Sequence, residues 1–522
     1  MNIKKKLPIG LSTLEGMISD NYTYVDKTRL INELVSGKYY FLSRPRRFGK
    51  SLLLDTLKQA YLGNKKIFKG LYLEHHWDWN TQYPVIHVSF AMSSAIESGA
   101  VLRDIITAQL SAHATLYNII LPDRTYETQF DYLIKSIAEQ SVSKKVVILI
   151  DEYDKPILDV IDQPESAYHN REILKSFYGV IKDNDAHLQF VFLTGVSKFS
   201  KVGLFSGLNN LNDISLDAKY ADICGYTQAE LENTFSDYLT AGNVDKAMLK
   251  LWYNGYNFAG TEIQKVYNPF DILLFFDKGF QYRSFWFETG NPAFLIKLIQ
   301  RYHYYFPEME EVHISENSLS TFEIDDIPLP TLLFQTGYLT IKAETMIGAM
   351  RGYVLSYPNL EVKASLNNAL ARMGTTTLLQ SANMNKLVAC LAKKDLQGLG
   401  EVFHGYFSSI PHDWYRNNDI QHYEGFYASI VYSYFCALGY KTIAEDATNV
   451  GKIDLTIELP DKILILEFKL KKNGDAISAL QQIKDRHYAD KYKTQKKPIH
   501  LMGICFDSDE RNVCDVVSCI ED

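Results

Sequence analysis

The segment Gly49-Lys50-Ser51 has the residue types that bind nucleotide phosphates. Glycine lets the backbone approach phosphate oxygens, lysine can reach the β- and γ-phosphates, and a serine hydroxyl can take a position around Mg²⁺. Backbone N–H groups at the start of a following helix add affinity for anions. Gly49, Lys50 and Ser51 are therefore predicted to bind ATP, with Ser51 also beside the metal ion.

The residues around this segment decide between a nucleotide site and a basic turn that only caps a helix. G-K-S strings are common by chance, and Arg44 stands where a loop of the form G-x-x-x-x-G-K-[ST] has its first glycine. However, a candidate strand at 39–42 precedes the loop and a candidate helix at 51–61 follows it, as such a loop requires. The context therefore favours the nucleotide site.

An acidic strand further along the chain supports the same prediction. The apolar run 146–150 ends in Asp151 and Glu152. An aspartate in this place can hold Mg²⁺, and a glutamate beside it can polarise the water that attacks the γ-phosphate. The alternative is a buried strand whose acidic end only faces solvent. A later candidate strand, 189–193, ends at Thr194, which either senses the γ-phosphate or only caps the strand.

A second group of chemically active residue types lies near the C-terminus. Glu424 lies at the start of an apolar helix, Asp454 at the start of a strand, and Glu467-Phe468-Lys469 at the end of the next strand. Strand alternation places Glu467 and Lys469 on one face. Carboxylates bind hard cations such as Mg²⁺ or Mn²⁺, and a nearby lysine can help activate water for phosphodiester cleavage. The alternative for an isolated E-x-K is a solvated strand edge.

The charge around this group is positive, although the chain as a whole has a formal net charge of -8. Between Lys462 and Lys497, ten lysines and arginines oppose four acidic residues, which gives the segment a charge of +6. Such a surface could bind a phosphate backbone, with Lys471 and Lys472 as contacts. The alternative is a solvated, lysine-rich helix and loop.

The pattern of strands and helices divides the chain into three regions. Over residues 1–225, candidate strands such as 85–90 alternate with candidate helices such as 101–117, which predicts a mostly parallel sheet with helices on both faces. Residues 226–404 are mainly helical, and strands return over residues 405–522. The predicted fold class is therefore a multidomain α/β protein.

The middle region is predicted to be a helical connector with a winged-helix-like part. The candidate helix 227–239 begins with Thr227 and Glu230, which have the spacing of a capping box. The short candidate helix 332–336 is followed by two candidate strands. A helix followed by a hairpin suits a winged helix, but any β-hairpin packed on helices has the same pattern.

The last region is predicted to be a sheet flanked by two helices, 422–438 and 476–492. The candidate strands are 441–444, 454–458, 463–469 and 500–505. Pro460-Asp461-Lys462 supplies a turn between the second and third of these strands. Asp454 and Glu467 are therefore expected on adjacent strands.

The composition excludes several protein classes. Hydrophobic residues make up 46% of the chain and charged residues 22%, which is typical of a globular protein rather than a disordered one. The negative net charge excludes a simple basic nucleic-acid coat protein. The sequence shows no secretory signal, no apolar stretch long enough to span a bilayer and no C-x-x-C pair. We therefore expect a soluble, cytoplasmic protein without a membrane partner.

The chain resembles the predicted AAA-ATPase-like family, which is common in bacteria and whose members usually have a C-terminal PD-(D/E)xK nuclease-like domain. The resemblance rests on the segments 24–28, 44–51, 151–156, 193–196, 252–256 and 357–362. It covers essentially the whole chain, and an arginine at position 44 is typical of the family. It implies an N-terminal P-loop ATPase domain and a C-terminal restriction-endonuclease-like α/β domain.

The resemblance also gives roles to the C-terminal residues. It implies that Asp454, Glu467 and Lys469 form the core of a nuclease site. Glu424 would assist metal binding from its helix, and Gln482 would contact DNA or position its helix. The implied partner is nucleic acid, with DNA favoured over RNA.

Two functions remain open from the sequence. In the first, ATP binding and hydrolysis regulate a metal-dependent nuclease. In the second, the nucleotide site operates a conformational switch and the nuclease fold only binds nucleic acid. A third, an interaction protein with two decayed sites, is disfavoured by intact Lys50, Asp151 and Lys469. Related ATPases often work as rings or dimers, so a homo-oligomer is also open, with Arg46 and Arg47 as candidate arginine fingers.

Overall fold

The protein divides into two compact units. The first comprises Met1–Gly290 and Val312–Asn359, and the second comprises Asn291–Glu311 and Leu360–Asp522. The computed structural model describes residues 5–91, 95–199, 204, 208, 210–260, 265–289, 305–320, 324, 326, 328–372, 375–410 and 424–521. The first two residues of the predicted helix 422–438 therefore lie outside the described residues.

A five-stranded parallel sheet forms the centre of the first unit. Its strands are β1 (Tyr39–Ser43), β2 (Val85–Ser89), β3 (Val146–Asp151), β4 (Leu188–Gly195) and β5 (Asn212–Asp213). They lie in the order β2-β3-β4-β1-β5, and every neighbouring pair is parallel. The four longer strands are nearly continuous apolar runs, as strands buried on both faces are. The predicted parallel sheet is confirmed, and β4 lies between β1 and β3.

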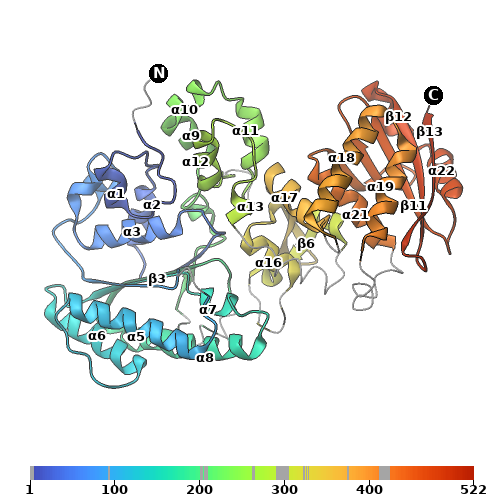
Figure 1. The fold of residues 1–522 in the computed structure, drawn as a ribbon. Coiled ribbons are helices and arrows are strands. Elements are labelled where there is room, and N and C mark those ends of the chain that lie inside the picture. The colour runs from blue at the N-terminus through green and yellow to red at the C-terminus, as the bar shows by residue number, and fades with distance from the viewer. Residues whose placement is uncertain are drawn as a thin grey trace. The chain divides into compact units, whose positions relative to one another are not determined.

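Helices cover this sheet on both faces (Figure 1). Helices α5 (Gly99–Leu116), α6 (Tyr126–Gln140) and α8 (Pro164–Asp183) lie together on one face, and α3 (Lys50–Tyr61) lies on the other. Helices α5, α6 and α8 each bury one apolar stripe, as amphipathic helices do, whereas most residues of α3 are buried. Shorter helices complete this part of the unit: α1 (Leu14–Ser19), α2 (Thr28–Leu34), η1 (Lys65–Phe68), α4 (Leu73–His76), α7 (Lys155–Leu158), η2 (Asp185–His187) and η3 (Ala218–Tyr220).

A cluster of helices rich in aromatic residues follows the parallel sheet in the first unit. Its members are α9 (Gln228–Thr234), α10 (Ser236–Ala241), α11 (Lys246–Tyr253), α12 (Pro269–Asp277) and α13 (Trp286–Thr289). Helix α9 begins with the predicted capping box, in which Thr227 and Glu230 each accept a hydrogen bond from the other's backbone N–H. The single helix predicted over 227–239 is wrong, because Phe235 leaves helical geometry while its ring packs against Phe276.

A three-stranded antiparallel sheet completes the first unit. Its strands are β6 (Val312–Ser315), β7 (Thr340–Ile347) and β8 (Met350–Ser356), in the order β6-β8-β7, with α15 (Glu316–Ser320) and α16 (Leu329–Thr336) between β6 and β7 in the chain. Helix α16 ends at Gly337, whose φ of 91° is the left-handed geometry that glycine adopts at helix ends. A helix followed by a hairpin is present, as the winged-helix-like prediction requires.

The second unit contains a mixed five-stranded sheet. Its strands are β9 (Lys441–Ala447), β10 (Lys452–Glu458), β11 (Ile463–Leu470), β12 (Ile499–Asp507) and β13 (Asn512–Glu521). They lie in the order β13-β12-β11-β10-β9, with β11 and β12 parallel and the other pairs antiparallel. The predicted β10–β11 hairpin is confirmed. Strand β13 was not predicted, and its sequence has no strict alternation, since its buried residues Val513 and Val516 lie three positions apart.

Helices pack on the sheet of the second unit from both faces. Helix α22 (Ala476–Asp485) covers β11 and β12, where Leu480 and Ile483 pack against Ile465 and Leu501. The other helices of this unit are η4 (Phe306–Glu310), α17 (Leu360–Leu370), α18 (Thr377–Lys393), α19 (Leu396–Ser408), α21 (Glu424–Ala437) and η5 (Tyr488–Gln495). Tyr427 of α21 stacks on Phe506 of β12, a residue that strand alternation places on the face opposite Leu501.

The single helix predicted over 476–492 is wrong, because α22 ends at Asp485 and a 3₁₀ helix follows after His487, whose φ is 47°.

In the described part of the chain, no helix is long and apolar enough to cross a membrane.

Candidate nucleotide and metal sites

The loop between β1 and α3 holds the side chain of Lys50. The Lys50 ammonium donates to the backbone oxygen of Arg44 at 2.9 Å and to that of Pro45 at 3.0 Å. Because an ammonium has three N–H donors, one remains for a phosphate oxygen. Burial lowers the pKa of Lys50, while the charges of Asp151 and Glu152 oppose that shift. The lysine is therefore held in place before any ligand arrives.

The backbone of the same loop can bind an anion. Arg47 and Gly49 have φ values of 67° and 94°, in the left-handed region. Left-handed residues next to right-handed ones turn successive N–H groups to one side and form an anion-binding concavity. A Cβ added at Gly49 would meet no atom within 4 Å, so the space beside this residue is open. Gly49 is also the N-cap of α3, whose first N–H groups add to the positive potential.

The side chains of Ser51 and Thr194 both contact Asp151, and all three residues were predicted for the nucleotide site. The Ser51 hydroxyl donates to Asp151 Oδ2 at 2.6 Å, and the Thr194 hydroxyl donates to Asp151 Oδ1 at 2.8 Å. This convergence follows from the strand order, because β4 places Thr194 between the loop after β1 and the end of β3. Asp151 is thus bonded to two hydroxyls, one of which belongs to the predicted metal-binding serine.

Glu152 lies at the same edge of the sheet. Its φ of 51° is uncommon for a residue other than glycine and turns the chain sharply after β3. Burial raises the pKa of Glu152, and the positive charges of Lys50 and Arg46 oppose the shift. The carboxyl therefore lies in the field of the loop lysine.

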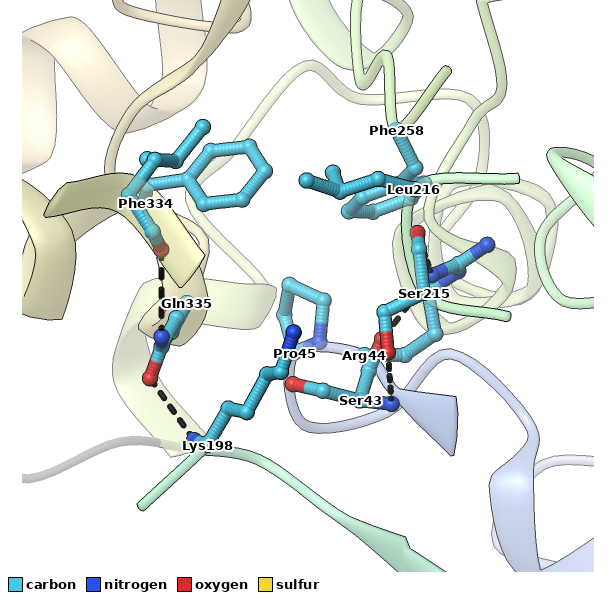
Figure 2. Close-up of a pocket in the computed structure, with 10 residues that line it drawn as sticks. Ser43, Arg44, Pro45, Lys198, Ser215, Leu216, Phe258, Phe334 and Gln335 are labelled. Carbon is cyan, nitrogen blue, oxygen red and sulfur yellow. Dashed lines mark hydrogen bonds between the residues drawn. The ribbon is translucent and has the colours of Figure 1, made fainter. Parts of the chain in front are cut away.

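Arg44 has a structural place in the loop, as Figure 2 shows. Its side chain is 1% exposed, and its guanidinium donates to the backbone oxygens of Ser43 at 2.9 Å, Ser215 at 2.8 Å and Tyr220 at 3.1 Å. The guanidinium also lies 4.1 Å from the ring centre of Phe258. Burial lowers the pKa of Arg44 to about 10. The guanidinium is therefore committed to backbone carbonyls rather than to a nucleotide.

Side chains from the later part of the first unit hold two loops of the nucleotide site. The Trp286 indole donates to the backbone oxygen of Arg46 at 3.1 Å. Gln335 Oε1 accepts from the backbone N–H of Lys198 at 2.8 Å, beside a small cavity of about 20 Å³ (Figure 2). Sequence reasoning did not find these residues, because no local pattern connects positions so far apart in the chain.

Asp154 was also not predicted as part of the site. Its carboxylate accepts from the backbone N–H of Val196 at 3.1 Å and of Ser197 at 2.6 Å, and so fixes the chain just after Thr194. Burial raises the pKa of Asp154, while the hydrogen bonds from Ser197 oppose the shift. The signal for this residue was its position three residues after Asp151, on the turn that follows β3.

The two strand carboxylates of the second unit face each other. Leu455 pairs with Leu466 across β10 and β11, which brings Asp454 opposite Glu467. Asp454 Oδ2 accepts from the backbone N–H of Phe468 at 2.7 Å. Burial raises the pKa of both carboxyls, and the charge of Asp454 further raises that of Glu467. Two carboxylates on neighbouring strand positions that face each other repel when both are ionised.

Glu467 is a buried carboxylate with one unmatched oxygen. It is 1% exposed; Oε1 accepts from Gln482 Nε2, whereas Oε2 has no hydrogen-bond partner among the described residues. A buried, unmatched carboxylate oxygen beside a second carboxylate fits a divalent cation, which would remove both the repulsion and the unmatched acceptor. Within the described ranges, no three His, Cys, Asp or Glu side chains are already grouped to hold a metal.

Glu424 and Lys469 lie beside this pair of carboxylates. Glu424 Oε2 accepts from the backbone N–H of Leu470 at 3.1 Å, and burial raises the pKa of Glu424. The Lys469 ammonium lies 3.6 Å from Glu467 Oε1, and its charge lowers the pKa values of Glu424, Asp454 and Glu467 against burial. The structure therefore brings all three predicted carboxylates into the field of Lys469.

Comparisons with known proteins match two parts of the chain to known families. Residues 8–205 match the family described as predicted AAA-ATPase, and residues 422–516 match the PD-(D/E)XK nuclease superfamily. A protein of Azotobacter chroococcum mcd 1, described as "Uncharacterized protein in vnfD 5'region", is 46% identical over 513 residues, which cover 98% of each chain. The chain belongs to this predicted AAA-ATPase family with a C-terminal PD-(D/E)XK nuclease domain. No solved structure matches it.

The basic segment of the PD-(D/E)XK domain is partly neutralised. The Lys471 ammonium lies 2.6 Å from Asp507, Lys491 pairs with Asp446, and Lys493 lies 2.7 Å from Asp490. Lys462 is buried and donates to the backbone oxygen of Leu391. Lys472 is exposed, and its charge lowers the pKa of Glu424, which places it near the carboxylates. Of the two lysines predicted to contact nucleic acid, Lys471 is thus held by Asp507.

Proposed function

We propose that the protein binds and hydrolyses ATP in its AAA-ATPase domain and cleaves nucleic acid with a divalent cation in its PD-(D/E)XK domain. The observation that supports the cleavage most is the buried Glu467 carboxylate, which faces Asp454, has one unmatched oxygen and lies beside Lys469. Mg²⁺ would serve both sites, and Mn²⁺ is an alternative in the second.

In the ATPase site, Lys50 and the loop N–H groups would bind the phosphates of ATP, and Ser51 with Asp151 would hold Mg²⁺. Glu152 accepts a proton from the attacking water, a role for which its raised pKa suits it. Thr194 would sense the γ-phosphate, a role supported by its hydrogen bond to Asp151. Asp154 keeps Thr194 in place by fixing the chain that follows it.

In the nuclease site, Asp454 and Glu467 would hold the divalent cation and Glu424 would assist. A bound divalent cation stabilises negative charge that develops on the phosphate and lowers the pKa of a water. Lys469 would orient the attacking water through its ammonium, since lysine is not a ligand of hard cations. Gln482 keeps Glu467 in its orientation by donating to Oε1.

The alternative function, an ATP-gated switch with a nuclease fold that only binds nucleic acid, is supported by different contacts. Trp286 and Gln335 hold the phosphate loop and the chain after β4, so a change at the nucleotide would act on both. This function predicts ATP-dependent binding of nucleic acid without cleavage. A cleavage assay with Mg²⁺ or Mn²⁺, with and without ATP, separates the two functions.

The partner and setting follow from the same proposal. DNA is the favoured nucleic acid. A homo-oligomer remains open, with Arg46 and Arg47 as candidate arginine fingers. The cytoplasm is the expected compartment, because all six cysteines are free thiols. The three-region division at 225 and 404 stays a prediction.

Replacing Lys50 by alanine is expected to weaken ATP binding by at least about tenfold, because a charge-assisted hydrogen bond to phosphate is lost. Calorimetric titration of Mg-ATP measures this, and circular dichroism checks that the variant is folded. The exposed Lys65→Ala is the control and should bind as wild type. Unchanged affinity in the Lys50 variant would contradict the nucleotide assignment.

Replacing Glu152 by glutamine is expected to leave ATP affinity nearly unchanged and to slow hydrolysis by about 100-fold or more, because the amide cannot accept the proton of water. Phosphate release measures turnover, and titration with ATP measures affinity. Glu165→Gln on the exposed start of α8 is the matched control. Wild-type turnover in the Glu152 variant would remove this residue from the mechanism.

Replacing Lys469 by alanine is expected to lower nucleic-acid cleavage by about 100-fold or more while metal-induced thermal stabilisation persists. The reason is that Lys469 acts on water and not on the cation. A gel assay with labelled DNA and a melting curve with and without Mg²⁺ provide the two readouts, and Lys493→Ala is the control. Full cleavage by the Lys469 variant would show that the lysine has no catalytic role.

A further inference from the structure

Arg486 is an exposed residue beside the carboxylates of the nuclease site. It is the C-cap of α22 and lies one helical turn after Gln482, which donates to Glu467. Its Nη1 donates to the hydroxyl of Tyr488 at 3.0 Å, and Tyr488 is fully buried. The guanidinium is therefore held by a buried partner, although Arg486 as a whole is exposed.

The guanidinium lies close to the start of the strand that holds Asp454. A Cβ added at Gly451 would be 2.7 Å from Arg486 Nη1 and 2.9 Å from the Tyr488 hydroxyl. The guanidinium thus lies over the backbone of Gly451, three residues before Asp454. The hydrogen bond to Tyr488 raises the pKa of Arg486, and the charges of Glu467 and Asp454 add to that shift. Only a residue without a side chain at position 451 allows this approach.

Among the residues that the structure describes, no carboxylate lies within ion-pair distance of the Arg486 guanidinium, whereas Lys471, Lys491 and Lys493 each pair with an acid. A guanidinium that is held in place and has no ion pair among these residues favours an anion. Its planar fork of N–H donors matches two oxygens of a phosphate.

We propose that Arg486 binds a backbone phosphate of the nucleic-acid strand and positions that strand across the Asp454–Glu467 pair. The inference rests on the proposed nuclease function and adds the residue that orients the substrate. Tyr488 and Gly451 contribute by holding the guanidinium at the edge of the site. Arg486 touches the substrate away from the reacting atoms, so its loss affects binding more than the chemical step.

The test compares Arg486→Gln with Lys493→Gln, which removes the same charge from a paired, exposed lysine of the same segment. Both changes are made in the full chain with the Lys469→Ala substitution, and binding of a fluorescein-labelled DNA duplex is followed by anisotropy over a range of salt concentrations. Arg486→Gln is expected to weaken binding about tenfold and to reduce the slope of log affinity against log salt by about 0.9, which corresponds to one lost phosphate contact. Lys493→Gln should change neither quantity.

Kinetics in the otherwise wild-type chain give an independent readout. Arg486→Gln is expected to raise KM with kcat nearly unchanged, because uniform binding is lost. Arg486→Lys should keep the salt slope and lose part of the affinity, and Tyr488→Phe should show a smaller rise in KM. The same affinity and salt slope in Arg486→Gln and its parent would overturn the inference, as would a loss of thermal stability as the only effect. If the chain with Arg486 intact neither binds nor cleaves DNA or RNA, the proposed function itself fails.

Discussion

Replacing Arg44 by glycine is expected to weaken the first unit, although glycine is the usual residue at this position of a phosphate-binding loop. The buried guanidinium donates to the backbone oxygens of Ser43, Ser215 and Tyr220. Glycine removes these donors and leaves buried carbonyls unmatched, each at a cost of about 1–3 kcal/mol. We therefore expect the free energy of unfolding to fall by about 3–5 kcal/mol, in the range seen when a buried network is broken.

Thermal unfolding of the full chain and calorimetric titration with ATP measure this effect. Arg44→Lys should be intermediate, because an ammonium keeps the charge but not the planar set of donors. The exposed Arg46→Ala in the same loop is the control, with an expected change within about 0.5 kcal/mol. ATP binding should weaken in Arg44→Gly, since Lys50 is held by the backbone oxygens of residues 44 and 45. Wild-type stability, or tighter ATP binding, would contradict the structural role of Arg44.

The phosphate loop illustrates what sequence reasoning can predict. Gly49, Lys50 and Ser51 form one continuous segment whose strand and helix neighbours are local, so residue types and spacing were sufficient to place them. Ser51, Asp151 and Thr194 were predicted for one nucleotide site, but the direct hydrogen bonds from the two hydroxyls to Asp151 were not. The bond from Thr194 depends on the position of β4 between β1 and β3, and the order of strands in a sheet does not follow from their spacing in the chain.

The direction of the Arg44 side chain could not be predicted for a similar reason. Its acceptors at Ser215 and Tyr220 come from a segment more than 170 residues away, and nothing in the local pattern marks them. The same holds for Trp286 and Gln335, which contact the site from the later part of the first unit. Asp154 could have been predicted more easily, because it lies only three residues after Asp151 in the sequence.

In the second unit, the hairpin and its turn were sufficient to place Asp454 beside Glu467. The continuous helix predicted from 476 was wrong because α22 ends at Asp485. This error matters because the end of α22 places Arg486 beside the site. No Gly or Pro marks this end in the sequence. The +6 charge of the segment was correct as a sum, but long-range partners such as Asp446 and Asp507 neutralise part of it.

Replacing Glu467 by glutamine is expected to abolish cleavage and, without metal, to stabilise the second unit at about pH 8. The Glu467 carboxyl is buried beside Asp454, and these two causes raise its pKa above the ordinary value. A carboxyl with a raised pKa keeps its proton up to a higher pH in the folded state than in the unfolded state. Its contribution to stability therefore falls as the pH rises from the ordinary carboxyl value of about 4.3 through the raised one. Glutamine does not ionise, so at position 467 it causes no loss of stability over this pH range.

The measurement is the melting temperature of wild type and Glu467→Gln at about pH 5 and about pH 8, with EDTA and with Mg²⁺. At the lower pH without metal the two proteins should be similar, and at the higher pH the variant should be the more stable. Mg²⁺ at about 100 times its Kd should stabilise wild type by about 2.7 kcal/mol, and more strongly at the higher pH, where both carboxyls are ionised. The variant should not respond, and Asp490→Asn, an exposed acid, should respond like wild type. A variant that loses stability at high pH and keeps its response to Mg²⁺ would show that Glu467 is a structural carboxyl and not a ligand.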